Sequence, residues 1–256
     1  MSSYIPDLTL YTVVFAVLVT VFAGFVKGAV GFAMPLIMIS LFSSFLSPDM
    51  ALAGLVLPTL FSNISQAFRH GFSPALAVSK AYWRILVATV IFIPISAQFF
   101  WVIPHDLFLW MLGVPITVFA LAQLSGRSLA LPFRHRSRAE WVFGSIGGLY
   151  GGVSGIWGPP LIVYLLSIRA CKMETVQVQG VVFLIGAVVL LAAHLQSGLL
   201  TNSALGFSAL LVLPAIFGQA IGFRLQDRLD PIRFLRWTQV LLVITGLNLI
   251  RQASGL

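Results

Sequence analysis

The chain has 256 residues, of which 59% are hydrophobic and only 9% are charged. A soluble domain carries roughly 25% charged residues, because polar side chains must cover its surface. The composition therefore excludes a soluble enzyme, a disordered chain and a nucleic-acid-binding protein, although the formal net charge is +8. The single cysteine, Cys171, excludes disulfide scaffolds and thiolate metal clusters. We interpret the chain as an all-helical, multi-pass membrane protein whose surroundings are the lipid bilayer.

Continuous apolar runs divide the chain into ten segments, each expected to be helical. A bilayer core about 30 Å thick requires about 20 apolar residues in a helix. Three segments, the second of each half and the first of the second half, are too short for a comfortable crossing. The start of the chain is not expected to be a cleavable signal, because no base precedes its apolar run. The segments cover 8–26, 33–46, 50–69, 81–102, 106–124, 140–151, 157–168, 174–195, 204–224 and 231–250.

Basic residues mark the connections that are expected to face the cytoplasm, since Lys and Arg in short loops remain inside. Thirteen of the fifteen bases form four groups, and the remaining loops (the N-terminus, 43–50, 102–107 and 196–203) hold none. This alternation predicts that each half crosses an odd number of times, that the halves are inverted, and that both termini lie outside, in the periplasm. The groups are Arg69, Lys80 and Arg84; Arg127, Arg134, Arg136 and Arg138; Arg169 and Lys172; and Arg224, Arg228, Arg233 and Arg236.

An internal repeat supports the same division of the chain. The pattern GxxxGxxGxxxP occurs at Gly24–Pro35 and again at Gly148–Pro159, 124 residues apart, and PxxxxxW occurs at Pro104–Trp110 and Pro231–Trp237, 127 apart. We therefore expect a first transmembrane repeat at 1–126, a basic cytoplasmic linker at 127–138, and a second, inverted repeat at 139–256. Each repeat holds about five hydrophobic segments and begins with short or broken helices.

The glycine and proline residues of the two motifs predict a break in each half. Glycine permits unusual backbone angles, whereas proline lacks an N–H and suits the first turn of a helix. Corresponding interruptions in the two halves of a transporter point to its binding site, although small residues in membrane helices also serve close packing. New half-helices are expected to start near Pro35 and Pro159. Their exposed N–H groups and partial positive charge favour a small anion near the membrane midplane.

Lys27 strengthens this hypothesis, because it lies in an apolar segment away from every basic connection. A buried ammonium is costly unless it is paired, and a substrate anion would pair it; the alternative is that Lys27 snorkels to the inner surface. Asn63 and Gln66, three residues apart, would share one helix face of the cavity. The candidate substrate-binding residues are Lys27, Gly28, Gly31, Phe32, Ala33, Met34, Asn63, Gln66, Ser154, Gly155, Ile156, Trp157 and Gly158.

Several chemistries are not indicated by the sequence. All seven acids lie in predicted connections or at segment ends, so a mid-span carboxylate for Na⁺ or proton coupling is not expected. His194, in a late segment, could titrate near neutral pH but is more typical of a hydrogen-bonded interfacial histidine. There is no HExxH, GxSxG or GK[ST] motif, so we expect no enzyme, no cofactor and no metal, and any transport to be secondary or passive.

The two motifs and their surroundings resemble the sulfite exporter TauE/SafE family. The residues that carry the resemblance are Gly24–Pro35, the run GGLYGGVSGIWGPPLIVYLL at 147–166, and Pro214 with 218–224. The resemblance implies a bacterial inner-membrane permease that exports sulfite or small sulfonates and related organic anions. Phe32, Ala33 and Met34 stand where many relatives have more glycine, so the two half-sites need not contribute equally.

The leading hypothesis is therefore a secondary anion transporter with a site at two broken helices. One alternative is an anion channel of the same architecture, whose flux would not saturate. Another is a membrane subunit or assembly factor that transports nothing. The sequence leaves the choice between monomer and homodimer open.

Overall fold

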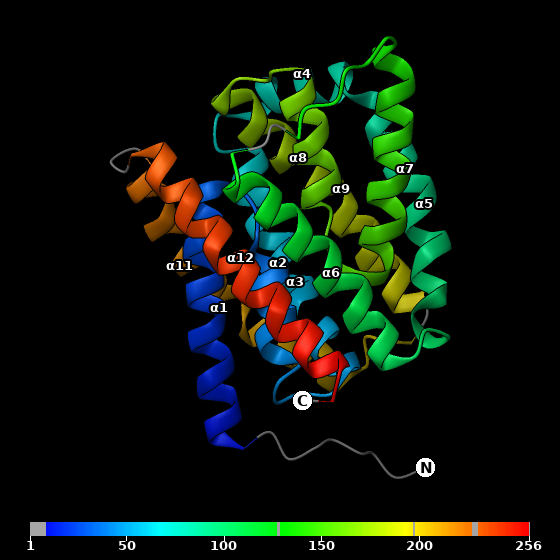
Figure 1. Ribbon diagram of the computed structural model, residues 1–256. Coiled ribbons are helices and arrows are strands. Elements are labelled where there is room, and N and C mark those ends of the chain that lie inside the picture. The colour runs from blue at the N-terminus through cyan, green and yellow to red at the C-terminus, as the bar shows by residue number, and fades with distance from the viewer. Residues whose placement is uncertain (1–8, 127–128, 197, 227–229, 256) are drawn as a thin grey trace.

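The computed structural model describes residues 9–126, 129–196, 198–226 and 230–255, which form helices and no strand. Figure 1 shows the helices stacked into one bundle, with α1 and α11 at one side and α5 and α7 at the other. In chain order they are α1 (Leu10–Val30), α2 (Met34–Phe42), α3 (Pro48–Ala67), α4 (Phe72–Ala81), α5 (Trp83–Ala97), η1 (Gln98–Trp101), α6 (His105–Leu124), α7 (Arg136–Ser154), α8 (Gly158–Ser167), α9 (Lys172–Gln196), α10 (Asn202–Leu210), α11 (Val212–Gln226) and α12 (Pro231–Ala253).

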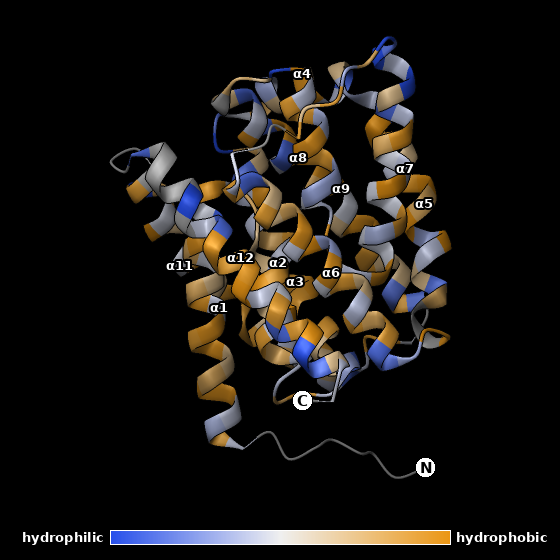
Figure 2. Cartoon of the chain, in the orientation of Figure 1, coloured by the Kyte–Doolittle hydropathy of each residue, from blue (hydrophilic) through white to orange (hydrophobic). Residues whose placement is uncertain are grey.

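The lengths and composition of the helices are those of a multi-pass membrane protein. Within the described ranges, five helical stretches are long and apolar enough to cross a bilayer, and a sixth results if α4 and α5 count as one broken span. Hydrophobic residues cover most of the length of the helices, and hydrophilic segments gather towards their ends (Figure 2). The helical fold and the membrane setting are thereby confirmed.

Some element boundaries differ from the sequence-based prediction. The stretch 140–151, expected to be short, belongs to the 19-residue α7, which extends into the basic linker as far as Arg136. Residues 72–80, expected to be a connection, belong to α4, which is bent by 81° from α5. The expected segment 204–224 is divided between α10 and α11 at Leu211. Pro214 explains this division, because it has no N–H to continue the helical hydrogen bonds.

Glycine residues allow the main helix pairs to approach closely. The most extensive helix contacts join α1 to α11, α5 to α7, and α6 to α12. A Cβ added at Gly28 of α1 would overlap the backbone oxygen of Gln219, and one added at Gly152 of α7 would overlap that of Ile93. When each helix is exchanged for its equivalent in the other half, the pair α1 and α11 becomes the pair α7 and α5. The pair α6 and α12 stays the same pair. A twofold repeat requires this correspondence. The inverted orientation of the halves stays a prediction.

The two ends of the bundle differ in their connections. We call the end with connections 68–71, 129–135 and 168–171 the basic end, and the end with 43–47, 102–104 and 198–201 the opposite end; they are the upper and lower ends in Figure 1. α2 runs towards the opposite end and α8 towards the basic end. At 1.5 Å per residue, these helices of 9 and 10 residues span about 13 and 15 Å, or roughly half of a bilayer core. Their starting points therefore lie deep in the protein, facing each other.

The native Cys171 offers a test of the orientation, because it is exposed at the basic end. Positive loops remain in the cytoplasm, so we expect a membrane-impermeant maleimide to label Cys171 in inverted vesicles and not in spheroplasts. A matched variant, Asn202→Cys in a Cys171→Ser background, moves the thiol to an exposed position at the opposite end. It should show the reverse pattern. Labelling of both cysteines from one side would contradict the two-ended arrangement.

Candidate functional site

The first motif breaks the chain between α1 and α2, as predicted. α1 ends at Val30, and Gly31 adopts a left-handed conformation with φ 88°, its N–H donating to Lys27 O at 2.7 Å. Ala33 is also left-handed, with φ 79°, which is unusual for a residue with a side chain. α2 then starts at Met34, with Pro35 in its first turn. Because this helix start has no side-chain cap, its first N–H groups remain available.

The second motif breaks the chain between α7 and α8 in a similar way. α7 ends at Ser154, and Gly155 has φ 71° with its N–H donating to Gly151 O at 2.7 Å. The Ser154 hydroxyl accepts the Ile156 N–H at 3.1 Å and donates to the Tyr150 carbonyl. The Ser154 hydroxyl and the Ile156 amide are thus hydrogen-bonded to each other within the break, and their binding role stays a prediction.

The start of α8 offers fewer donors than the start of α2. Gly158 keeps its N–H, but Pro159 and Pro160 follow and have none. In α2, by contrast, the single Pro35 leaves the N–H groups of Met34 and Leu36 in the first turn. The two half-sites are thus unequal in their backbone donors.

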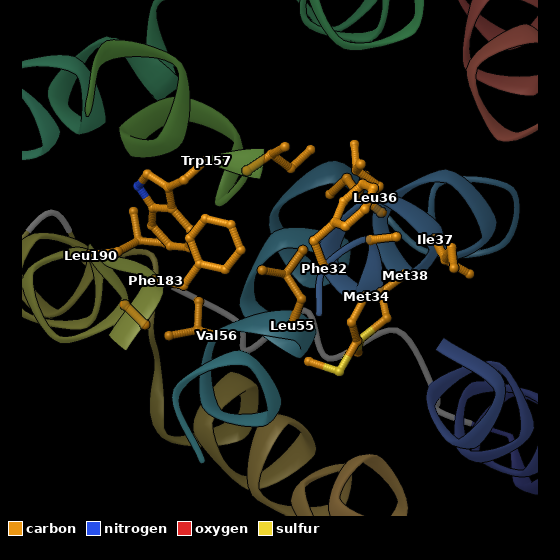
Figure 3. Close-up of a cluster of buried hydrophobic side chains, with 14 of the residues drawn as sticks. Phe32, Met34, Leu36, Ile37, Met38, Leu55, Val56, Trp157, Phe183 and Leu190 are labelled. Carbon is orange, nitrogen blue, oxygen red and sulfur yellow. The ribbon is translucent and has the colours of Figure 1, made fainter. Parts of the chain in front are cut away.

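A cavity of about 20 Å³, room for about one water molecule, lies between the two breaks. Both breaks, α1 and the two long helices α3 and α9 contribute to its wall. Trp157 and Phe183 lie against each other with ring centroids 6.2 Å apart, and Phe32 faces them (Figure 3). The lining residues are Lys27, Phe32, Ala33, Pro35, Leu36, Thr59, Asn63, Ile156, Trp157, Gly158 and Phe183.

Lys27 supplies the positive charge of this cavity. Its side chain is only 1% exposed, which contradicts the alternative that it snorkels to the membrane surface. The ammonium Nζ donates to Ser62 Oγ at 2.7 Å and to Asn63 Oδ1, both uncharged acceptors on α3. Neither ion pair recorded in the described ranges involves Lys27. A buried cation without a carboxylate favours an anion beside it, because its charge is otherwise uncompensated.

Asn63 holds the ammonium in place by linking three helices. While its Oδ1 accepts from Lys27 on α1, its Nδ2 donates to the Phe183 carbonyl on α9 at 2.9 Å. Both ends of the amide therefore have a hydrogen-bond partner. The Thr59 hydroxyl, one turn earlier on α3, is 1% exposed and has no hydrogen-bond partner. Thr59 is thus a second polar group in the cavity wall that is open to a guest.

The remaining predicted residues surround the cavity without lining it. Gly28 packs against α11, Met34 is buried at the start of α2, and Gly155 lies under leucine side chains. Gln66 donates to the Gly31 carbonyl at 2.9 Å and so stabilises the first break.

Sequence reasoning missed four lining residues: Pro35, Leu36, Thr59 and Phe183. Thr59 had a signal, because it lies four residues before Asn63 and so shares its helix face. Phe183 had none, since its position in the wall depends on how α9 packs against α3.

A comparison with protein-family models supports the interpretation of the chain as a membrane transporter. The family model described as "Sulfite exporter TauE/SafE" matches residues 16–249. The chain belongs to the TauE/SafE family. Comparisons with curated proteins and with solved structures find no match. Membership of this transporter family implies transport of a small anion, in agreement with the charge of the cavity.

A buried ionic cluster near the basic end surrounds Glu140, one of the acids expected in a connection or at a segment end. Glu140, in the second turn of α7, is 1% exposed. Its carboxylate pairs with Arg136 at 2.9 Å and Arg84 at 3.2 Å, and it accepts the Tyr164 hydroxyl at 3.0 Å. The cluster joins α5, α7 and α8. It contributes no residue to the cavity lining, so it has a structural place outside the anion site.

The left-handed break at Gly155 can be tested by adding one methyl group. Gly155→Ala should lower the thermal stability of the protein in detergent, because a left-handed residue with a Cβ costs roughly 1–2 kcal/mol. Gly147→Ala on the same helix is the control, since a Cβ there meets nothing within 4 Å. It should leave stability unchanged or raise it, because alanine favours helix. Equal stability of the two variants would argue against the strain assigned to the break.

Proposed function

We propose that the protein is a secondary transporter that exports sulfite or a small sulfonate or organic anion. The anion would bind between the two breaks, near the membrane midplane, in a conformation whose cavity is wider than the water-sized one of this structure. The observation that carries this proposal is Lys27, a buried ammonium that lines the cavity and has only uncharged partners. Family membership independently supports an anionic substrate.

The electrostatics of the site favour a negative guest from three directions. Lys27 contributes a positive charge when it is protonated, and each half-helix start adds about half a charge from its aligned peptide dipoles. α2 and α8 approach the cavity from opposite ends of the bundle, so both starts face the same volume. Within the part of the chain that the structure describes, no carboxylate lines that volume. A small anion would therefore be attracted without competition from a fixed negative charge.

We further propose that the two halves are inverted repeats in a bacterial inner membrane, with the basic end in the cytoplasm and both termini in the periplasm. The exchange of helix pairs between the halves and the positive-inside rule support this orientation. In this arrangement the cavity lies between the repeats, where secondary transporters hold their substrates.

Replacing the ammonium tests the site directly. Lys27→Met should weaken sulfite binding at least about tenfold, because hydrogen bonds to charged groups contribute about 1.5–3 kcal/mol. Thermal unfolding in detergent, followed with and without sulfite, measures both stability and binding. Lys80→Met, which removes an exposed lysine of α4, is the matched control and should bind as the parent does. Unchanged affinity in Lys27→Met would remove Lys27 from the site.

Flux in liposomes tests the transport class and its coupling. Sulfite titrates near neutral pH, so it can carry a proton itself, and the cavity needs no carboxylate of its own. We expect saturable sulfite flux that responds to an imposed pH gradient. Flux that ignores the gradient would reject proton co-transport, flux that does not saturate would indicate a channel, and the absence of both binding and flux would indicate a non-transporting subunit.

A further inference from the structure

The face of α3 that lines the cavity changes its chemistry along the helix. Leu52 and Leu55 lie towards the opposite end, Thr59 and Asn63 line the cavity, and Gln66 lies towards the basic end. All five side chains are buried. Since the spacings between them are three or four residues, they form one continuous stripe. The stripe is apolar on one side of the cavity and polar on the other.

The facing surface of α9 changes in the same direction, although α9 runs the opposite way. Gln179 lies towards the basic end, Phe183 lines the cavity, and Leu190 lies towards the opposite end. Both helices therefore place an amide between the cavity and the basic end, and leucine between the cavity and the opposite end.

The internal repeat allows the two ends of the cavity to be compared residue by residue. With the 124-residue offset of the glycine motifs, Gln66 corresponds to Leu190 and Leu55 corresponds to Gln179. A repeat that preserved its chemistry would place equivalent residues at both ends of the cavity. Here, the two ends have the same scaffold but opposite polarity. The asymmetry belongs to the side chains and not to the helices that carry them.

The closure at the basic end consists of hydrogen bonds that water can replace. Gln66 Nε2 donates to the carbonyls of Gly31 at 2.9 Å and Val176 at 3.1 Å, thereby linking the first break to α9. Gln179 Oε1 lies beside the same glycine, 2.6 Å from where a Cβ of Gly31 would be. The side-chain oxygens of both glutamines are buried and have no partner. Separating these amides would expose groups that water readily solvates.

The closure at the opposite end is apolar. The side chains of Leu55, Leu190 and Leu52 converge on Gly155, where an added Cβ would lie 2.9, 3.6 and 3.9 Å from their methyl carbons. Figure 3 shows Leu55 and Leu190 on the two sides of Phe183 and Val56. An anion cannot keep its hydration shell in such a constriction, because apolar walls exclude water.

We propose that the anion reaches the cavity from the basic end, past Gln66 and Gln179, and that Leu52, Leu55 and Leu190 form a water-excluding seal towards the opposite end. This inference rests on the proposed function, because it assigns an access route to the same site. Loading occurs through the hydratable closure, and release requires the leucines to separate. With the basic end in the cytoplasm, this order is that of an exporter.

A cysteine in the cavity reports the access route without measuring transport. We choose Thr59→Cys in a Cys171→Ser background, because Thr59 lies between the two closures. A membrane-impermeant thiol reagent should modify this cysteine from the basic end and not from the opposite end. Modification from the opposite end, or from neither end, would overturn the proposed route.

Adding an amide to the seal tests the leucines. Leu190→Gln in the Thr59→Cys background should make the cysteine reactive from both ends. In liposomes, the same substitution should add a non-saturating sulfite leak. Leu195→Gln, at a half-exposed position one turn further along α9, is the control and should change neither. A folded Leu190→Gln protein without the added reactivity and the leak would overturn the seal.

The outcomes separate this inference from the proposed function. If the parent protein neither binds nor transports sulfite, the proposed function fails whatever the labelling shows. If the parent transports sulfite but the cysteine reacts only from the opposite end, the access route fails and the site remains.

Discussion

The buried Lys27 ammonium is the interaction on which the rest of the site depends. Its only recorded partners are Ser62 and Asn63, so its charge is solvated but not neutralised. Asn63 is in turn held by the Phe183 carbonyl, which keeps α1, α3 and α9 in register around the cavity. Burying a cation is unfavourable, and a bound anion would offset part of this free-energy cost. Residues of both helix breaks line the same cavity as Lys27.

The glycine residues of each motif divide into two physical roles. Gly28 and Gly152 let helix backbones touch, whereas Gly31 and Gly155 end their helices in a left-handed conformation. From the sequence, close helix packing and chain breaks were two alternative explanations for these glycines. In the structure both occur within the same motif, because packing needs a glycine on the outer face of a helix and a break needs one at its end.

A feature could be predicted from the sequence when the residues that cause it lie close together in the chain. The breaks could be predicted, since Gly31, Gly155 and the following prolines act on the backbone locally. The sequence left two places open for Lys27, the cavity and the inner surface, and helical spacing favoured a cavity position for Asn63. The contributions of Phe183 and the burial of Glu140 could not be predicted, because each depends on helices that are distant in sequence. A single chain without an alignment carries no record of those pairings.

The close helix pairs restrict how the bundle can move. Where glycines bring two backbones into contact, as at Gly28 and Gly152, the paired helices cannot slide or separate without losing that fit. The Glu140 cluster fastens α8 to α5 and α7 in addition. We therefore expect α1 with α11, and α5 with α7 and α8, to move as two groups. Any relative rotation of these two groups would have to occur at other helix contacts, such as the one between α3 and α9.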